Sequence, residues 1–290
     1  MLTFRDFLTG FRKLGIDQTR PVIAHASLSA FGEIQGGAEA VLGALISSFE
    51  TVIMPVFTYR TMIIPEAGPP DNAITYGSGK DTNRMAEMYQ PDMPADFMMG
   101  RVAEKLRLHP NAQRSMHPIL SFAGMHAKPL LDLQVTHDPL LPILGLTDED
   151  GWVLLMGVDN TVNTSIHYAE KLSGRKQFIR WAITPNGIVS CWGFPGCSDG
   201  FEAIAPRLER VKSSARVGEA QIQAIPLVGL IDAVCGWLRQ EPLALLCGRE
   251  DCARCNAVRD SVAHQAGEHS ASKGSGVVPK PRNRSPRKRK

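Results

Sequence analysis

The sequence predicts an α/β fold, and two short stretches of the chain support that prediction. Residues 21–25 (PVIAH) and 51–58 (TVIMPVFT) are apolar runs typical of buried strands. Between them, Gly36 and Gly37 precede residues 38–49, whose apolar side chains recur at helical spacing. The order strand, turn, helix, strand is typical of α/β architecture.

The rest of the chain continues to alternate between helices and strands. Residues 151–158 (GWVLLMGV) are apolar enough to form a strand in the middle of a sheet. Residues 61–81 are rich in Gly, Pro and Asn, which predicts a long surface loop that carries Glu66, Asp71 and Asp81. The other expected elements are helices at 1–16, 95–108, 164–172 and 226–239, strand-bearing residues 113–123, and a hairpin of 178–182 with 187–192.

A chain of 290 residues, 43% of them hydrophobic, can bury the core of one large domain or two closely packed domains. No run of about 18 apolar residues occurs, so we expect no transmembrane helix and no membrane partner. Residues 1–16 predict an amphipathic helix rather than a secretory signal, because charged and apolar residues alternate at helical spacing. We therefore expect a cytoplasmic protein.

The net charge of +3 combines two parts of opposite sign. From Lys273 onward the chain has eight Lys or Arg residues and no acid, which leaves 24 basic against 29 acidic residues before it. Residues 267–290 are rich in Ser, Gly, Pro and basic residues, so we expect a folded body at 1–262 and a disordered basic tail at 263–290. A nucleic-acid-binding arm is the alternative for the tail. The acidic body suits a cationic small molecule better than DNA, so no nucleic acid is expected.

All six cysteines lie in the last third of the chain, and without a secretory signal we expect no disulfides among them. Cys247, Cys252 and Cys255 form a C-x4-C-x2-C pattern that could hold zinc, with Cys191 or Cys197 as a fourth ligand. No second CxxC pair occurs, and no histidine stands at zinc-finger spacing. We expect reduced thiols without a metal, and the zinc site remains the alternative.

Three segments carry residues suited to chemistry. In the first, His25-Ala-Ser-Leu-Ser-Ala-Phe-Gly32 and Gly36-Gly37 lead from a strand into a helix. Backbone N–H groups at a helix N-terminus bind anions, and glycine lets a ligand approach closely, so a phosphate-bearing cofactor would fit here. A plain strand–helix turn is the alternative, since the segment matches no nucleotide-binding fingerprint.

The second segment, residues 114–123 (RSMHPILSFA), brings a permanent charge and two hydroxyls together. Arg114 could pair with a phosphate, and a structural ion pair explains it equally well.

The third segment, residues 158–170 (VDNTVNTSIHYAE), follows the buried strand, where open α/β sheets place ligands. On a helix, Thr164, His167 and Glu170 are three residues apart and share one face. An imidazole accepts protons near neutral pH, so this face could hold a general base. A capped helix with a surface His–Glu pair is the alternative.

The three segments, in this order and spacing, resemble the aminoglycoside 3-N-acetyltransferases, antibiotic N-acetyltransferases that are distinct from the GNAT superfamily. The resemblance runs from residue 21 into the 200s, and RSxHPxxSFA with NTxxHxAE is its most specific combination. It implies a layered α/β/α fold with a central mixed sheet, with 1–262 as the acetyltransferase domain. The matching stretches are HASLSAFGEIQGGAEAVLGAL (25–45), MPVFTY (54–59), PADFMMGRVAEKLRLHP (94–110), RSMHPILSFAGMHA (114–127), GWVLLMGVDNTVNTSIHYAE (151–170) and GCSDGF (196–201).

The resemblance also implies residue roles, with acetyl-CoA as co-substrate and no metal. His167 would be the catalytic base, Glu170 its acidic neighbour facing the acceptor, and Thr164 a support for His167 or for the thioester carbonyl. Tyr59 and Asp159 would join Glu170 in binding the substrate. The implied cofactor contacts are His25, Ser27, Leu28, Ser29, Phe31, Gly32, Gly37, Arg114 and Ser115.

One stretch departs from the family pattern. Members commonly carry Asp-Pro-aromatic-Gly-x-x-Ser-Pro before the central strand, whereas residues 138–146 are DPLLPILGL. Because that loop helps to shape the acceptor side, the departure concerns the acceptor more than the cofactor. The leading hypothesis is direct acetylation of the 3-amino group of an aminoglycoside by a monomer or homodimer. The alternatives are the same transfer to an amino sugar or metabolite, and a non-catalytic CoA- or zinc-binding module.

Overall fold

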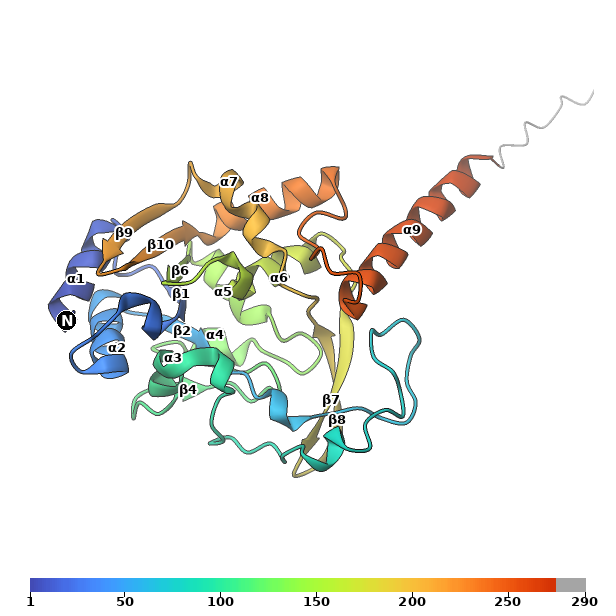
Figure 1. Cartoon of the computed structure of the whole chain (residues 1–290), viewed down its shortest axis with the longest axis horizontal. Coiled ribbons are helices and arrows are strands. Elements are labelled where there is room, and N and C mark those ends of the chain that lie inside the picture. Colours follow the sequence, from blue (N-terminus) through green and yellow to red (C-terminus); the bar gives the residue numbers. More distant parts are fainter. Residues whose placement is uncertain (275–290) are drawn as a thin grey trace, which may run out of the picture.

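The computed structural model describes residues 1–274, which fold into a sheet between two layers of helices (Figure 1). The sheet has seven strands in the order β4-β5-β2-β1-β6-β10-β9. Its strands are β1 (Val22–Ala26), β2 (Val52–Pro55), β4 (Gln113–Arg114), β5 (Phe122–Met125), β6 (Trp152–Met156), β9 (Ser213–Val217) and β10 (Ala220–Pro226).

Strand β1 lies in the centre of the sheet and runs parallel to both of its neighbours, β2 and β6. The outer pairings, β2 with β5, β5 with β4, β6 with β10 and β10 with β9, are antiparallel. The predicted layered α/β/α fold with a central mixed sheet is therefore confirmed. The parallel centre matters for function because the carboxyl ends of β1, β2 and β6 meet at one edge.

Each face of the sheet is covered by helices, and alternate residues of the central strands point to opposite layers. Val22 and Ala24 belong to the core beneath the first group of helices, whereas Ile23 belongs to the core on the opposite face. The first group is α1 (Phe4–Lys13), α2 (Gly37–Ser48) and α3 (Gly100–Arg107). The second is α4 (Lys128–Asp132), α5 (Leu141–Asp148), α6 (Thr164–Leu172), α7 (Ala205–Leu208) and α8 (Leu227–Gln240).

A second sheet of three strands, in the order β3-β7-β8, stands beside the main one. It contains the predicted hairpin, β7 (Phe178–Thr184) and β8 (Gly187–Phe194), with β3 (Met62–Ile63) on its edge. Gly187 has φ +105°, a conformation that glycine adopts easily and that closes the tight turn. The hairpin projects from the body in Figure 1 and carries Arg180 and Phe194 towards the cavity described below.

The last described element, α9 (Ala253–Gly274), differs from the expected chain end. Residues 263–274 are helical, where the sequence predicted the start of a disordered tail. Cys255 and Val258 are buried in the first turns of α9, and extending a helix that is already nucleated costs little. The rest of the predicted basic tail, 275–290, lies outside the described residues. Within residues 1–274, no helix is long and apolar enough to cross a membrane.

Candidate active site

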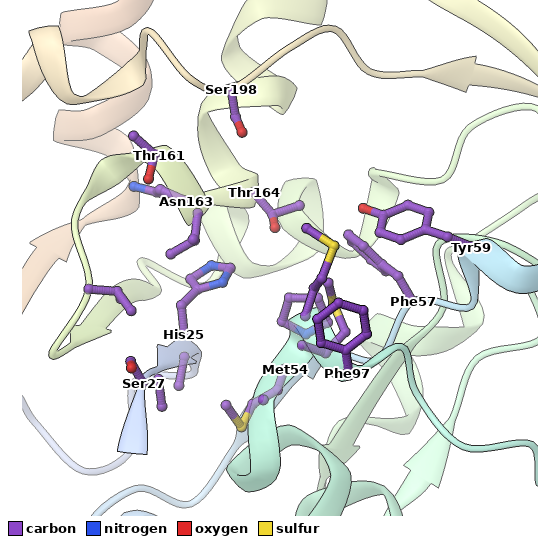
Figure 2. A pocket seen from close by; sticks show the side chains of 18 of the residues that line it. His25, Ser27, Met54, Phe57, Tyr59, Phe97, Thr161, Asn163, Thr164 and Ser198 are labelled. Atoms are coloured by element: carbon purple, nitrogen blue, oxygen red, sulfur yellow. The ribbon is translucent and has the colours of Figure 1, made fainter. Parts of the chain in front are cut away.

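A cavity of about 1170 Å³ opens at the carboxyl edge of the parallel strands. The segments that follow β1 and β6 form much of its wall, as the sequence predicted for ligand binding at a strand end. Figure 2 shows His25 and Ser27 on one side of the cavity and Phe57 and Tyr59 on the other. The cavity is large enough for an extended ligand together with a second molecule.

The segment after β1 forms one wall, here called the strand-end wall, together with residues 161–167. Ser27, Leu28, Ser29, Gly32 and Gly37 all line the cavity. Leu28–Phe31 is a short 3-10 helix. The N-terminus of α2 follows it. The Gly37 N–H donates to the Ile34 carbonyl oxygen, whereas the N–H groups of Leu28 and Ser29, at the start of the 3-10 helix, have no acceptor within that helix.

Two glycines shape this wall because they have no side chain. Gly37 has φ +54°, and a Cβ added there would meet nothing within 4 Å, so the backbone faces free space. Gly100 has φ +82°, and a Cβ there would lie 3.0 Å from the Ala26 carbonyl oxygen. Glycine at position 100 therefore lets the start of α3 pack directly against the end of β1.

His25 occupies the inner end of the same wall. Its side chain is 6% exposed, and its Nε2 has no hydrogen-bond partner among residues 1–274. Burial lowers the pKa of His25 to about 3, so the imidazole is neutral at physiological pH. The ring therefore offers either a neutral donor or a neutral acceptor to a ligand.

Three of the expected cofactor contacts lie away from the cavity. Phe31 is 2% exposed and packs edge-on against Phe7 in the core, with ring centroids 5.1 Å apart. Ser115 is buried, and its Oγ accepts a hydrogen bond from the Phe122 N–H at 2.9 Å. The sequence placed both near the ligand because each lies in a motif segment, but side chains in such a segment alternate between the cavity and the core.

Arg114 is the third expected cofactor contact that lies away from the cavity. Its guanidinium donates to the carbonyl oxygens of Met93 at 2.6 Å and Val56 at 3.0 Å, and its Nε donates to Ser121 Oγ at 3.0 Å. It also lies over the Tyr89 ring. Arg114 thus joins three chain segments and has a structural role, where the sequence left a phosphate contact and an ion pair open.

His167 lies on the cavity wall, where α6 follows β6. Its Nδ1 is 2.9 Å from Glu170 Oε2, and its ring packs edge-on against Phe201 with centroids 4.6 Å apart. A carboxylate accepts hydrogen bonds only, so Nδ1 donates in this contact, and in the neutral imidazole Nε2 is the nitrogen with the lone pair. The pair therefore presents an imidazole with a fixed tautomer to the cavity.

Glu170 stands behind His167 and does not line the cavity. Its side chain is 2% exposed, and its second oxygen, Oε1, accepts a hydrogen bond from Arg175 Nη1 at 2.6 Å. Arg175 also donates to the carbonyl oxygens of Pro242 and Ala244. Both Glu170 oxygens are thus engaged within the protein, one by His167 and one by Arg175.

Thr164 and Tyr59 line the cavity as predicted, and Asp159 does not. Figure 2 shows the Thr164 hydroxyl in the space between His25 and Tyr59. Burial raises the pKa of Tyr59 to about 12, so its phenol stays protonated. Asp159 is exposed and caps a short 3-10 helix, where its Oδ1 accepts from the Thr161 N–H at 2.9 Å.

A second part of the cavity lining, here called the far wall, was largely missed by sequence reasoning. It comprises Arg180 on β7, Phe194 at the end of β8, Pro195, Gly196, Ser198 and Asp199 after β8, and Arg254 on α9. Gly196, Ser198 and Asp199 lie in the family-like stretch 196–201, but the others belong to segments far apart in the chain that no local pattern marks. Apolar Phe97 and Met98 also border the cavity and are 87% and 68% exposed. The sequence placed Phe97 and Met98 within a helix at 95–108, whereas the α-helix begins only at Gly100.

The far wall is positively charged. Arg180 is 8% exposed; it donates to the Asn72 and Ile179 carbonyl oxygens and lies over the Phe178 and Phe194 rings. Burial lowers the pKa of Arg180 to about 10, and the nearby charge of Arg254 acts in the same direction. Among residues 1–265, whose side chains the structure describes, no salt bridge to Arg180 or Arg254 occurs. The acids Glu66, Asp71 and Asp81 of the 61–81 loop do not line the cavity.

Comparisons with known proteins identify the class. The family model for aminoglycoside 3-N-acetyltransferase matches residues 23–239, and the chain belongs to this family. Aminoglycoside N(3)-acetyltransferase IX of Micromonospora chalcea is 32% identical over 181 residues, which cover 58% of this chain and 62% of that relative. The match therefore spans less than two thirds of the relative's length.

Solved structures support the fold. Aminoglycoside acetyltransferase AAC(3)-IVa, as the apoenzyme, superposes with a TM-score of 0.72 at 22% identity, covering 90% of this chain and 98% of that one. The YokD protein of Bacillus subtilis gives a TM-score of 0.71 at 24% identity, covering 83% and 94%.

Proposed function

We propose that this chain transfers an acetyl group from acetyl-CoA directly to an acceptor amine, with His167 as the general base. The observation that carries the proposal is the His167–Glu170 pair, which presents one imidazole nitrogen to a cavity at the sheet edge. A related enzyme, AAC-IIIb, has been solved as a binary complex with CoASH, which supports acetyl-CoA as the co-substrate. Acetyl-CoA and reduced thiols are both cytoplasmic, so we place the reaction there.

In this proposal the strand-end wall binds the coenzyme. The phosphates and the pantetheine amides would meet the backbone N–H groups of Leu28 and Ser29 at the start of the 3-10 helix, near the N-terminus of α2, which favours negative charge. Leu28, with exposed Phe97 and Met98, offers apolar surface to the pantetheine arm. Neutral His25 lies at the inner end, where one hydrogen bond to an amide would satisfy its unpaired Nε2.

The chemical step then follows from the positions of the groups. The amine nitrogen attacks the thioester carbon, a C–N bond forms, and His167 Nε2 takes the proton that the nitrogen loses. Thr164 lines the cavity, and its hydroxyl would donate to the carbonyl oxygen as that oxygen gains charge, a contact worth roughly 3 kcal/mol in comparable sites. The C–S bond breaks and the CoA thiolate takes the proton from His167. Buried Glu170 stabilises the imidazolium in between.

Direct transfer is favoured over an acyl-cysteine intermediate because no cysteine appears among the described residues that line the cavity. Most of the rate enhancement then comes from alignment of the two substrates, which supplies about 7 kcal/mol or more in favourable cases.

For the acceptor, we propose the 3-amino group of an aminoglycoside. AAC(3)-IVa has been solved in complexes with a gentamicin and with apramycin, and AAC-VIa with sisomicin. Family membership extends this acceptor class to the present chain as the first to test.

A second acceptor class is favoured by Arg180 and Arg254. Two guanidinium groups without carboxylate partners in the described chain repel a polycationic drug and attract an anion. The second candidate is therefore an amine that also carries a carboxylate or phosphate, such as an acidic amino sugar.

One assay tests the proposal and separates the acceptors. The protein is mixed with acetyl-CoA and, in turn, gentamicin, apramycin, neomycin, an amino sugar phosphate and an amino sugar acid, and free thiol is measured. Thiol release above the acceptor-free rate, lost in His167→Gln while CoA still binds by calorimetry, supports the mechanism. Full turnover in His167→Gln contradicts it.

A further inference from the structure

A cluster of four cysteines, here called the thiol cluster, lies outside the cavity and has no role in the proposed reaction. Cys197 follows β8, Cys247 follows α8, and Cys252 and Cys255 stand at the start of α9. All four are buried, at 1% to 7% exposure, and their Sγ atoms lie within 4.8 Å of one another. Three separate stretches of chain thus converge on one point through sulfur.

The spacing of the sulfur atoms suits a metal. A tetrahedral zinc site has Zn–S bonds of about 2.3 Å, which puts neighbouring sulfurs about 3.8 Å apart. The other two cysteines, Cys191 and Cys235, stand outside the cluster, although one is buried and the other half-buried. Burial by itself therefore does not bring cysteines together in this protein.

A positive charge stands beside the cluster. Arg249 interacts with the Cys247 and Cys252 thiols and forms a salt bridge with Asp199 at 3.1 Å. A cation at this position offsets the net negative charge of a metal bound by four thiolates.

Backbone contacts hold the two halves of the cluster together. The Arg259 guanidinium donates to the Cys247 carbonyl oxygen at 2.7 Å, which fixes α9 to the loop after α8. A Cβ added at Gly200 would lie 2.5 Å from the Leu245 carbonyl oxygen, so the loop after β8 packs against the same loop backbone to backbone. The ligand positions are therefore set by the fold before any ion binds.

We propose that Cys197, Cys247, Cys252 and Cys255 bind one zinc ion in a closed, four-thiolate structural site. The pattern C-x4-C-x2-C with a distant fourth cysteine supplies the ligand set, and four sulfurs leave no open position for a substrate. The four thiols release their protons to solvent as the ion binds, so affinity rises with pH. The expectation of reduced thiols without a metal gives way here to the zinc alternative, with Cys197 rather than Cys191 as the fourth ligand.

The site has a consequence for the cavity. Gly196 and Ser198 flank Cys197 in the chain, and Arg254 lies between Cys252 and Cys255. Gly196, Ser198 and Arg254 all line the far wall. Arg254 Nη1 also donates to the Gly196 carbonyl oxygen at 2.8 Å. The ion therefore fastens α9 to the loop after β8 and holds the far wall in place. The metal site itself does not depend on the proposed acetyl transfer.

Metal content of the intact protein tests the inference. The full chain is purified under reducing conditions from zinc-supplemented culture, without chelators, and analysed by inductively coupled plasma mass spectrometry. We expect about one zinc per chain in the wild type and in Cys235→Ser, and less than about a tenth of that in Cys255→Ser and Cys197→Ser. Less than a tenth in the wild type, or full zinc in Cys255→Ser, overturns the proposal.

Three further measurements keep the test valid if the serine variants do not fold. Wild type loaded with Co²⁺ should show the intense visible bands of a tetrahedral thiolate site, and a spectrum of octahedral cobalt overturns the inference. Intact-mass analysis should show all six thiols reduced, and a mass that reports disulfides within the cluster overturns it as well. Removal of the ion by chelator should lower the melting temperature by roughly 5 °C or more.

Discussion

The two walls of the cavity are built in different ways. The strand-end wall comes from segments that directly follow β1 and β6, and its position is set by parallel strand pairing between Val22–Ala26 and Trp152–Met156. The far wall comes from the β7–β8 hairpin, the loop after it and the start of α9, which are fastened by side chains and by the thiol cluster.

The two walls therefore suit different tasks, catalysis for the strand-end wall and choice of acceptor for the far wall. The strand-end wall holds His167, the proposed base, together with the neutral imidazole of His25 and backbone N–H groups, which suit the proposed coenzyme that is the same for every acceptor. The far wall holds two arginines on elements that can change without disturbing the main sheet. We therefore expect substitutions on the first wall to affect turnover and substitutions on the second to affect the acceptor.

The largest effect is expected at His167. His167→Gln removes the proton acceptor while keeping a side chain of similar size, so kcat/KM should fall by about 10²–10⁴. The affinity for CoA, measured by calorimetry, should change little. The exposed His126→Gln variant is the matched control and should keep wild-type turnover. A large loss of CoA affinity in His167→Gln would show that the two walls do not divide the work as described.

A second large effect is expected at Glu170, on stability as well as on rate. Glu170→Gln leaves buried Arg175 without its carboxylate, and breaking a buried pair costs about 3 kcal/mol or more. Urea denaturation measures this loss, and Glu149→Gln on the surface is the control. Because Glu170 acts through His167, the variant should also change the pH profile of kcat, which a purely structural residue would leave unaltered.

Acid should destabilise the protein through two buried histidines. Burial lowers the pKa of His25 to about 3 and that of His117 to about 4, both from 6.5. Below pH 6.5 the unfolded chain binds protons that the folded chain does not. The free energy of unfolding therefore decreases as the pH is lowered below 6.5. Each histidine contributes a decrease of about 1.4 kcal/mol per pH unit until the pH reaches its pKa in the folded state.

A variant separates this effect from the titration of carboxylates. His117 Nδ1 accepts from the Ile119 N–H at 3.1 Å and the Leu120 N–H at 2.9 Å, contacts that an asparagine oxygen can reproduce. Between pH 6.5 and about 4, His117→Asn should reduce the slope of the unfolding free energy against pH. The expected reduction is the contribution of one histidine, about 1.4 kcal/mol per pH unit. An unchanged slope would mean that His117 is protonated in the folded state.

The smallest effect is expected on the far wall. Arg254→Gln should change the KM of the acceptor by about tenfold, since one charge at close range contributes roughly 1.4 kcal/mol in a partly exposed site. KM should rise for an anionic amine and fall for an aminoglycoside, while the KM of acetyl-CoA stays constant. Exposed Arg239→Gln on α8 is the control. If Arg254→Gln changed the KM of the acceptor and the KM of acetyl-CoA equally, the proposed difference between the two walls would be wrong.

Local patterns predicted much of the fold and half of the site. The helix at 164–172 and the strand within 151–158 were placed almost to the residue, because their periodicity and turn residues are local signals. The same locality led to the misplacement of Arg114 and Ser115. A motif marks a segment, but which of its side chains face the core depends on packing against β2 and β5.

The sequence alone determined the family, the α/β class and the helical face shared by Thr164 and His167, because each depends on residues that are near in the chain. Only the tertiary structure decided that Glu170 faces inward to Arg175, that Arg180 and Arg254 meet at the far wall, and that Cys197 joins three cysteines from a distant part of the chain. The reason is that distant contacts come from the packing of whole elements, and no local spacing encodes where those elements meet.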